Sequence, residues 1–252
     1  MSVRDSLVVP LFDEADALPA LLDEVARHWR GGEVVFVDDG SRDGTGDRIA
    51  ALARERGIAF VLLRHAENRG VGAAVRTGFR AARGERVVVY DADRPYPLED
   101  AERLLEALGS ADVATASPWH ADGAAEGVGR LRAAMSRAAS LLYRAALGRR
   151  SRGIRTFTCA FRAYRRSALE RVSFRSDGFL SSAEILATAL RLGLRVAEVP
   201  SRLRPRTEGR SKMRIARTAW AHARFLVGLA LKRTMPPAEE RASPRPRPEA
   251  RT

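Results

Sequence analysis

The segment from Arg86 to Pro97, which reads RVVVYDADRPYP, restricts the possible folds more than any other part of the chain. Its apolar run Val87–Tyr90 is continuous and rich in β-branched residues, as in a central strand buried on both faces of a parallel sheet. Two carboxylates, Asp91 and Asp93, follow at once, and two prolines then prevent further strand pairing. Side chains two residues apart in an extended chain point the same way, so we expect both carboxylates on one side of the backbone.

Two carboxylates at the end of a buried strand repel each other and lose hydrating water. A divalent cation removes this cost, and a hard cation held by few carboxylates keeps coordination sites for substrate phosphates. The pair Asp91 and Asp93 therefore predicts a metal site for a phosphorylated ligand. The same D-x-D pattern also occurs in ordinary polar turns, so this segment alone leaves both interpretations open.

The first 120 residues alternate between short apolar runs and amphipathic stretches. Strands are expected at 7–11, 34–37, 60–63, 87–90 and 113–116, and helices at 17–29, 43–56, 70–82 and 98–108. This alternation predicts an α/β fold, a doubly wound and mostly parallel sheet with helices on both faces. Ligands of such sheets bind beyond the carboxyl ends of the strands.

Three of these strands end in acidic residues, which are Asp13 with Glu14, Asp38 with Asp39, and Asp91 with Asp93. Turn and helix-capping chemistry would explain one such end, but the shared pattern favours a ligand site at one edge of the sheet. No G-x-G-x-x-G follows a strand, and acidic strand ends would repel a pyrophosphate bound directly on a helix N-terminus. The edge instead suits a base and ribose bound by carboxylates, with a metal-bound diphosphate.

Charge is distributed unevenly along the chain, whose net charge is +13. Residues 1–120 carry 15 basic and 21 acidic residues, whereas residues 121–252 carry 29 and 10. The basic half suggests an anionic partner such as phosphate groups, an anionic membrane or nucleic acid. The single cysteine, Cys159, fits a reducing compartment. No signal peptide is expected, because a polar-bounded strand begins at Leu7, within a few residues of the N-terminus. No transmembrane helix is expected, because no apolar run reaches 18 residues.

The second half of the sequence gives weaker signals. Helices are expected at 128–147, 178–192 and 215–232, strands at 157–164 and 196–199, and loops at 123–129 and 202–214. Arg132 and Ser136 lie one turn apart on the first helix and share a face, although the arginine could also be a solvated surface residue. Glu184 is a lone acid among apolar residues of the second helix, which fits either a catalytic base or a structural role.

The last expected helix, 215–232, carries Trp220 and flanking basic residues, as interfacial membrane helices do. Packing on its own domain or on a partner is equally open. The basic loop 202–214 fits either an anion-binding loop or a linker. It lacks the interleaved aromatic residues of nucleic-acid-binding segments, so no nucleic-acid partner is expected.

These segments together resemble the family 2 glycosyltransferases of the GT-A fold, in the branch of dolichol-phosphate and polyprenyl-phosphate mannosyltransferases. The matching segments are VVPLFDE, VVFVDDGSRDGT, ENRGVGAAVRTGFRAARGERVVVYDADRPYP, TFTCAFRAYRR, GFLSSAEIL and RVAEVPSRLRPRTEGRSKM. They cover roughly residues 7–213 in the order of the family.

The resemblance implies a role for several residues on the donor side. Asp91 and Asp93 would hold Mg2+ or Mn2+ on the donor diphosphate, Asp93 acting in catalysis. The residues that would bind the nucleotide sugar are Pro10, Phe12, Glu14, Asp39 and Ala92.

On the acceptor side, the resemblance implies that Arg132 and Ser136 bind the phosphate of an acceptor lipid. Arg206 and Lys212, in R-x-x-G-x-S-K, would clamp the donor diphosphate and acceptor phosphate and offset charge in the transition state. Glu184 matches an acid of the family, which would act as general base for a hydroxyl acceptor. A phosphate acceptor needs no base, because its oxygen is already anionic.

Three positions depart from the family pattern. Pro95 stands where a glutamine commonly completes the metal shell, and Pro118 stands where a phosphate-binding arginine is expected after the fifth strand. Asp13 replaces a usual asparagine. The side chain of a proline cannot ligate a metal or bind a phosphate, so these changes bear directly on activity.

The activity implied is that of an inverting, metal-dependent hexosyltransferase, moving mannose from GDP-mannose to a polyprenyl phosphate as a peripheral protein on the cytoplasmic membrane face. Alternatives are another donor, UDP-glucose or UDP-GlcNAc, a hydroxyl acceptor, or an inactive GT-A module that binds membrane or a partner. The expected organisation is a GT-A domain at 1–213, with a nucleotide-sugar half at 1–120 and an acceptor half at 121–213. An amphipathic helix at 214–234 and a disordered tail at 235–252 would follow.

Overall fold

A seven-stranded sheet forms the centre of the computed structural model, which describes residues 4–30, 32–205 and 215–231. In spatial order its strands are β3 (Phe60–Arg64), β2 (Glu33–Asp38), β1 (Asp5–Leu11), β4 (Arg86–Val89), β7 (Arg162–Arg165), β5 (Val113–Ser117) and β8 (Val196–Pro200). All are parallel except β7, which runs antiparallel to both β4 and β5. The expected mostly parallel α/β sheet is confirmed.

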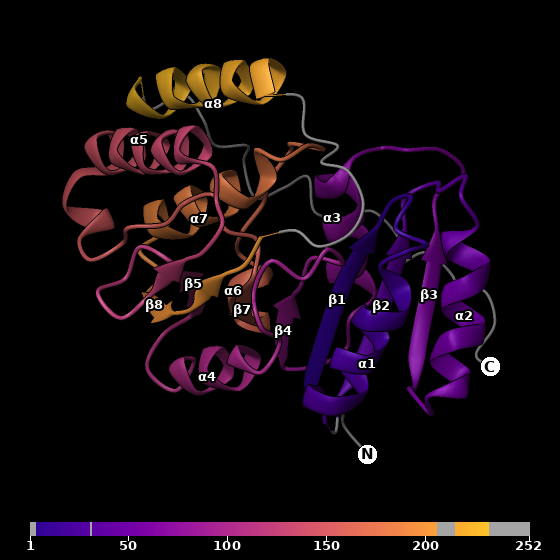
Figure 1. The fold of residues 1–252 in the computed structure, drawn as a ribbon. Helices are drawn as coiled ribbons and strands as arrows, with labels where there is room; N and C mark the ends of the chain where they lie inside the picture. The colour runs from indigo at the N-terminus through magenta and orange to yellow at the C-terminus, as the bar shows by residue number, and fades with distance from the viewer. Residues whose placement is uncertain (1–3, 31, 206–214, 232–252) are drawn as a thin grey trace.

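Helices cover both faces of this sheet (Figure 1). One face packs against α1 (Leu18–His28), α2 (Thr45–Glu55) and α4 (Asp100–Ala107). The other packs against α3 (Val71–Ala81) and α7 (Ser181–Arg191), with α5 (Arg130–Leu147) and α8 (Ile215–Ala230) further out. The short elements are α6 (Arg166–Leu169), the 3-10 turn η1 (Gly148–Ser151), and β6 (Ala124–Ala125) paired with β9 (Arg202–Leu203).

Strand β1 shows why this layering follows from the sequence. Side chains alternate between the two faces of a strand, so every position of a central strand must be apolar on both sides. Leu7, Val9 and Leu11 pack into the core with α1 and α2, whereas Val8 packs into the core with α3. All four are at most 1% exposed, so β1 is buried on both faces.

Two expectations about the second half are corrected by the structure. A strand was expected at 157–164, but the strand is only Arg162–Arg165, and residues 157–161 form an irregular loop. The side chain of Arg162 hydrogen-bonds within this loop, to the carbonyl oxygen of Phe157 at 2.7 Å. The segment 123–129, expected to be a loop, contains the short strand β6, because its backbone pairs with β9 far along the chain.

Helix α8 packs on α5 through aromatic contacts. The hydroxyl group of Tyr143 lies 2.7 Å from Nδ1 of His222, and the ring of Phe225 lies 6.2 Å from that of Tyr143. Leu229 is 4% exposed in the same core. Burial lowers the pKa of His222, so this residue joins α5 to α8 as a neutral imidazole at neutral pH. One side of α8 therefore packs against its own domain.

Within the described residues, no helix is long and apolar enough to span a membrane. Arg206, Lys212 and the expected disordered tail at 235–252 lie outside the described residues. The domain division at residues 213 and 214 stays a prediction.

Candidate active site

The carboxyl ends of β2, β1 and β4 meet at one edge of the sheet. These neighbouring strands run parallel, in register Leu11 with Asp38 and Val8 with Val89. The amide of Asp39 donates to the carbonyl oxygen of Leu11 at 2.8 Å. The expected convergence of the acidic strand ends is thereby confirmed.

The first two acidic segments are bound to each other. The amide of Asp13 donates to Ser41 Oγ and that of Glu14 donates to Thr45 Oγ1, both at 2.9 Å. Asp13 has φ 48° and accepts a hydrogen bond from the amide of Arg42 at 2.8 Å. Asp13 therefore connects the loop after β1 to the loop after β2. Pro10 is buried near the end of β1, and Phe12, half-buried, begins the loop.

Asp39 is buried and binds the loop that follows β3. One oxygen accepts from His65 Nδ1 at 2.6 Å and from the amide of Arg69 at 3.0 Å, and the other accepts from the amide of Gly70 at 2.6 Å. Nε2 of His65 lies 2.9 Å from Thr77 Oγ1 on α3. Asp39 thus positions the loop 65–70 at the edge of the site. Sequence reasoning missed His65, although its place two residues after the apolar run 60–63 put it at this edge.

Asp91 and Asp93 lie in a tight turn just beyond β4. The amide of Arg94 donates to the carbonyl oxygen of Asp91 at 3.1 Å, and Arg94 has φ 51°. Both carboxyl groups are half-buried, while Ala92 between them is 4% exposed. The strand ends at Val89, so this turn, and not strand alternation, sets where the two carboxylates lie.

A buried tyrosine supports this turn from the core. The hydroxyl group of Tyr90 lies 2.6 Å from Glu24 Oε2 on α1 and 2.7 Å from the carbonyl oxygen of Tyr96. Burial and the adjacent Glu24 carboxylate raise the pKa of Tyr90 well above its ordinary value, so it stays a neutral donor. The segment 90–96 is thus held at both ends.

The donor set of this turn fits a hard divalent cation. Among the described residues, no group of three or more His, Cys, Asp and Glu side chains gathers where it could hold a metal. A cation at Asp91 and Asp93 would therefore take its other ligands from water and a bound phosphate, which suits Mg2+ or Mn2+. Pro95 offers no side-chain ligand there.

The expected acceptor side lies around Ser136 on α5. Its hydroxyl group lies 3.0 Å from Thr158 Oγ1 and accepts from Trp119 Nε1 at 3.3 Å. The guanidinium group of Arg137 lies 4.3 Å over the ring of Trp119. These side chains adjoin a cavity of about 310 Å3, lined by Trp119, Arg137 and the loop that contains β6. Arg132 lies in α5, but its side chain is outside the described part of the structure.

The loop before β7 joins the two sides of the site. Thr158 contacts Ser136, and the neighbouring Cys159 is within hydrogen-bonding distance of the Tyr96 side chain in the segment after the D-x-D turn. Burial raises the pKa of the Cys159 thiol to about 11, so it is an inert, protonated core residue. Neither Thr158 nor Trp119 carried a sequence signal for this position.

Glu184, near the start of α7, binds backbone of the preceding loop. Its two oxygens accept from the amides of Arg175 at 3.0 Å and Ser176 at 2.9 Å. The same loop reaches α3, because the carbonyl oxygen of Asp177 accepts from the amide of Gly72 at 2.7 Å. These contacts give Glu184 a structural role, which is one of the two interpretations that the sequence left open.

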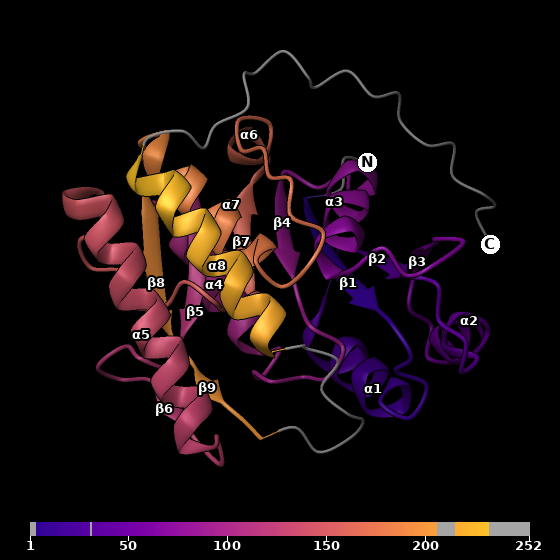
Figure 2. The same ribbon diagram turned by 90° about the horizontal axis from the view of Figure 1, so that it is seen from above.

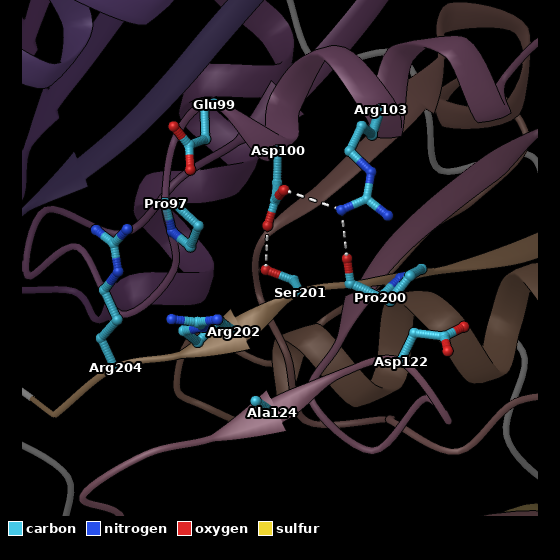
Figure 3. A pocket seen from close by; sticks show the side chains of 10 residues that line it. All are labelled: Pro97, Glu99, Asp100, Arg103, Asp122, Ala124, Pro200, Ser201, Arg202 and Arg204. Carbon is cyan, nitrogen blue, oxygen red and sulfur yellow. Dashed lines mark hydrogen bonds and ion pairs between the residues drawn. The ribbon is translucent and has the colours of Figure 1, made fainter.

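A second cavity, of about 350 Å3, lies beside Pro97, between the start of α4 and β9 (Figure 3). Two of its charged side chains, Asp100 and Arg103, are paired with each other. Asp100 accepts from Ser201 Oγ at 2.6 Å and from Arg103 at 3.2 Å. Arg103 also donates to the carbonyl oxygen of Pro200 at 3.0 Å. This network ties α4 to the end of β8, so we assign the cavity a structural role.

The basic segment leaves the described structure next to the D-x-D turn. The amide of Arg204 donates to the carbonyl oxygen of Pro95 at 2.8 Å, and its side chain pairs with Glu24 at 3.5 Å. Arg206 follows two residues later, at the start of residues 206–214.

Comparison with known proteins gives consistent matches over most of the chain. The model of the family "Glycosyl transferase family 2" matches residues 6–173. Polyprenol monophosphomannose synthase of Mycolicibacterium smegmatis is 34% identical over 217 residues, which cover 83% of this chain and 81% of that protein. Undecaprenyl-phosphate mannosyltransferase of Micrococcus luteus is also 34% identical, covering 84% and 88%.

A relative whose name gives glucose as the sugar is nearly as similar to this chain. Dolichyl-phosphate beta-glucosyltransferase ALG5A of Trichomonas vaginalis is 29% identical, covering 79% of this chain and 65% of that protein. Among solved structures, glucosyl-3-phosphoglycerate synthase from Mycobacterium tuberculosis, in complex with Mg2+ and uridine diphosphate, has a TM-score of 0.67 at 23% identity. That match covers 92% of this chain and 79% of that one, and it shows the likeness of the fold.

Proposed function

The chain belongs to glycosyltransferase family 2, and from this premise we propose that it transfers a hexose from a nucleotide sugar to a polyprenyl phosphate. The finer proposal is mannose from GDP-mannose, transferred at the cytoplasmic membrane face. The observation that carries it is the loop of Thr158 and Cys159, which lies between the D-x-D segment and Ser136. A donor diphosphate at the turn and an acceptor phosphate at Ser136 would therefore be neighbours.

The donor would lie along the carboxyl edge of the sheet. The end of β1 and the loop after it, with Pro10, Phe12 and Glu14, would contact the base and ribose, while Asp39 binds the loop after β3. Asp91 and Asp93 would hold Mg2+ or Mn2+. When bound, the cation supplies positive charge that stabilises the leaving nucleoside diphosphate.

The reaction proposed is a single displacement. A phosphate oxygen of the acceptor attacks the anomeric carbon, the bond from that carbon to the diphosphate oxygen breaks, and the configuration inverts. No general base is required, because the attacking oxygen is already anionic, and this agrees with the hydrogen bonds that occupy Glu184. Arg206 and Lys212 remain the proposed clamp. The support is that Arg204, two residues before Arg206 in the sequence, donates its amide hydrogen to the carbonyl oxygen of Pro95.

Arg137 has the chemistry to replace the arginine that Pro118 lacks. Its guanidinium group lies over the ring of Trp119, the residue after Pro118, and Nε1 of the same tryptophan donates to Ser136 Oγ. Stacking on an aromatic face leaves the edge of a guanidinium free to bind an anion. We therefore place the acceptor phosphate between Ser136 and Arg137.

Arg137→Ala is expected to lower kcat/KM for the acceptor about 10- to 100-fold, because a charge-assisted hydrogen bond contributes about 1.5–3 kcal/mol. KM for the donor should not change. The measurement is transfer in detergent with the acceptor concentration varied. Arg144→Ala, two turns further along α5 and exposed, is the matched control. Equal acceptor kinetics for both variants would contradict the assignment.

The function is tested by a donor screen with purified protein. Radiolabelled GDP-mannose, UDP-glucose and UDP-GlcNAc are each offered with Mg2+ or Mn2+, with and without a polyprenyl phosphate in detergent. We expect label from GDP-mannose to enter the organic phase only when metal and lipid are both present. Transfer from UDP-glucose instead would favour the activity in the name of the glucosyltransferase relative.

Other outcomes of the screen would refute the proposal in distinct ways. Metal-dependent donor binding without a lipid product points to another acceptor, such as a sugar hydroxyl. No donor binding at all points to an inactive module of this fold, with Pro95 and Pro118 as the changes that removed activity.

A further inference from the structure

The hydroxyl groups of Ser136 and Thr158 form a pair on the acceptor side of the site. Their oxygen atoms lie 3.0 Å apart, and Trp119 Nε1 donates to Ser136 Oγ at 3.3 Å. The indole nitrogen can only donate, so it uses neither of the two hydroxyl hydrogens. The bond between the hydroxyl groups takes one of them. The other hydrogen remains for a ligand, because neither hydroxyl group has a further partner among the described residues.

The order of burial gives this chain of hydrogen bonds a direction. Trp119 and Ser136 are half-buried, whereas Thr158 is exposed. A chain that runs from Trp119 through Ser136 to Thr158 lets each hydroxyl group accept one bond and donate one, and each bond then strengthens the next. The hydrogen that remains for a ligand is therefore that of Thr158, at the exposed end of the chain.

Thr158 belongs to an irregular loop that Glu198 on β8 holds in place. Oε1 of this acid accepts from the amide of Arg155 at 2.6 Å and from that of Thr156 at 2.7 Å. Thr156 Oγ1 in turn lies 2.5 Å from Oγ of Ser117, the last residue of β5. The two segments that border the acceptor cavity, the end of β5 and the loop 155–158, are thus joined through one carboxylate.

The loop is also fixed from the side of α5. The amide of Phe157 donates to Ser140 Oγ at 3.2 Å, and its ring stacks on that of Tyr143 with the centroids 5.0 Å apart. Figure 2 shows α5, β5 and β8 on the same side of the molecule. The backbone before Thr158 is therefore held by β8 and by the helix that carries Ser136, so the distance between the two hydroxyl groups is set before a ligand arrives.

The charge of Glu198 does not stabilise the fold by itself. Burial raises the pKa of its carboxyl group, so the ionised form is less favourable in the folded chain than in water. An acid that the fold keeps in spite of this cost, beside a candidate site, is better explained by the loop that it holds than by stability.

We propose that Thr158 is a further binding residue for the acceptor phosphate and that Glu198 is the residue that positions it. The phosphate would accept from Thr158 and from the guanidinium group of Arg137, which lies 4.3 Å over the ring of Trp119. The inference rests on the proposed function, because it adds two residues to the same acceptor site.

The first test removes the hydroxyl group and keeps the shape of the side chain. Thr158→Val is expected to raise KM for the acceptor about tenfold, because a hydrogen bond to a charged group is lost. KM for the donor should not change. Thr158→Ser should restore most of the acceptor affinity. The measurement is transfer to a short-chain prenyl phosphate in detergent, and Thr188→Val, the same change in α7, is the matched control.

The second test addresses the positioning role. Glu198→Leu removes the acceptor of two amides and should raise KM for the acceptor about fivefold, whereas Glu198→Gln keeps an oxygen atom there and should restore most of the affinity. In the Thr158→Val background, Glu198→Leu should add less than about twofold, because a positioning residue acts through the group that it positions. Glu106→Leu, at an exposed position of α4, is the control.

Two results would overturn the inference. Equal acceptor KM for Thr158→Val, Thr188→Val and the wild type would show that Thr158 does not bind the phosphate. Effects of Glu198→Leu and Thr158→Val that simply multiply would show that Glu198 does not act through Thr158.

Calorimetric binding of the same prenyl phosphate, without donor, separates this inference from the proposed function. Binding that Thr158→Val weakens, with no sugar transfer by the wild type, would keep the binding residue and refute the enzyme. Transfer by Thr158→Val with the acceptor KM of the wild type would refute the binding residue and keep the enzyme.

Discussion

Asp93→Asn is expected to lower the rate of sugar transfer at least about 10³-fold. The substitution keeps the size of the side chain and removes the negative charge that would hold the cation at the D-x-D turn. Charge stabilisation by a bound metal is worth several kcal/mol in the transition state, and about 4 kcal/mol corresponds to this factor. Asp93 is half-buried at the edge of the sheet, so the folded state should survive the change.

The measurement is single-turnover transfer, together with calorimetric binding of the donor in Mg2+ and in EDTA. Asp93→Asn should lose the metal-dependent part of donor binding. Asp47→Asn is the matched control, because its side chain is 83% exposed on α2 and its ion pair with Arg64 should contribute little. Metal-dependent binding by Asp93→Asn at wild-type strength would show that the cation lies elsewhere. In an inactive module, the wild type would transfer no sugar and Asp93→Asn would leave membrane binding intact.

Arg162→Met is expected to lower the free energy of unfolding by about 3–5 kcal/mol. Arg162 is fully buried, and its guanidinium group donates to Thr115 Oγ1 at 3.0 Å and to the carbonyl oxygens of Phe157 and Ser182. Methionine replaces the aliphatic part of the arginine side chain but has no donor, so these acceptors would be left buried and unsatisfied, at about 1–3 kcal/mol each. A loss of this size is a large part of the stability of a typical domain.

Urea unfolding followed by circular dichroism measures this effect. Arg171→Met is the control, because Arg171 is exposed and its hydrogen bond to the carbonyl oxygen of Leu192 is 3.3 Å long. The control should change stability by less than about 0.5 kcal/mol. If Arg162→Met also cost less than about 1 kcal/mol, the buried arginine would not be what holds the loop before β7.

The alternation of strands and helices and the place of the D-x-D segment were predictable, because both depend on local patterns. Each strand from β1 to β5 is a short apolar run of the sequence, and the parallel order then forces the carboxyl ends to one edge. The meeting of Glu14, Asp39 and Asp91 at that edge therefore follows from strand order alone. The prediction failed at 157–161, where the mostly apolar sequence FTCAF indicates the start of a strand.

Periodicity and strand order act through neighbours along the chain, so the sequence alone predicts the sheet, its acidic edge and the carboxylate pair. The partners of the polar side chains depend instead on tertiary packing. Asp39 binds His65, Arg137 lies on Trp119, and Arg162 is buried among carbonyl groups. Asp39 and His65 are 26 residues apart in the sequence, and Arg137 and Trp119 are 18 apart. Tertiary packing brings the members of each pair into contact. A buried polar group must find a partner wherever the fold brings one close, and no local pattern records that choice.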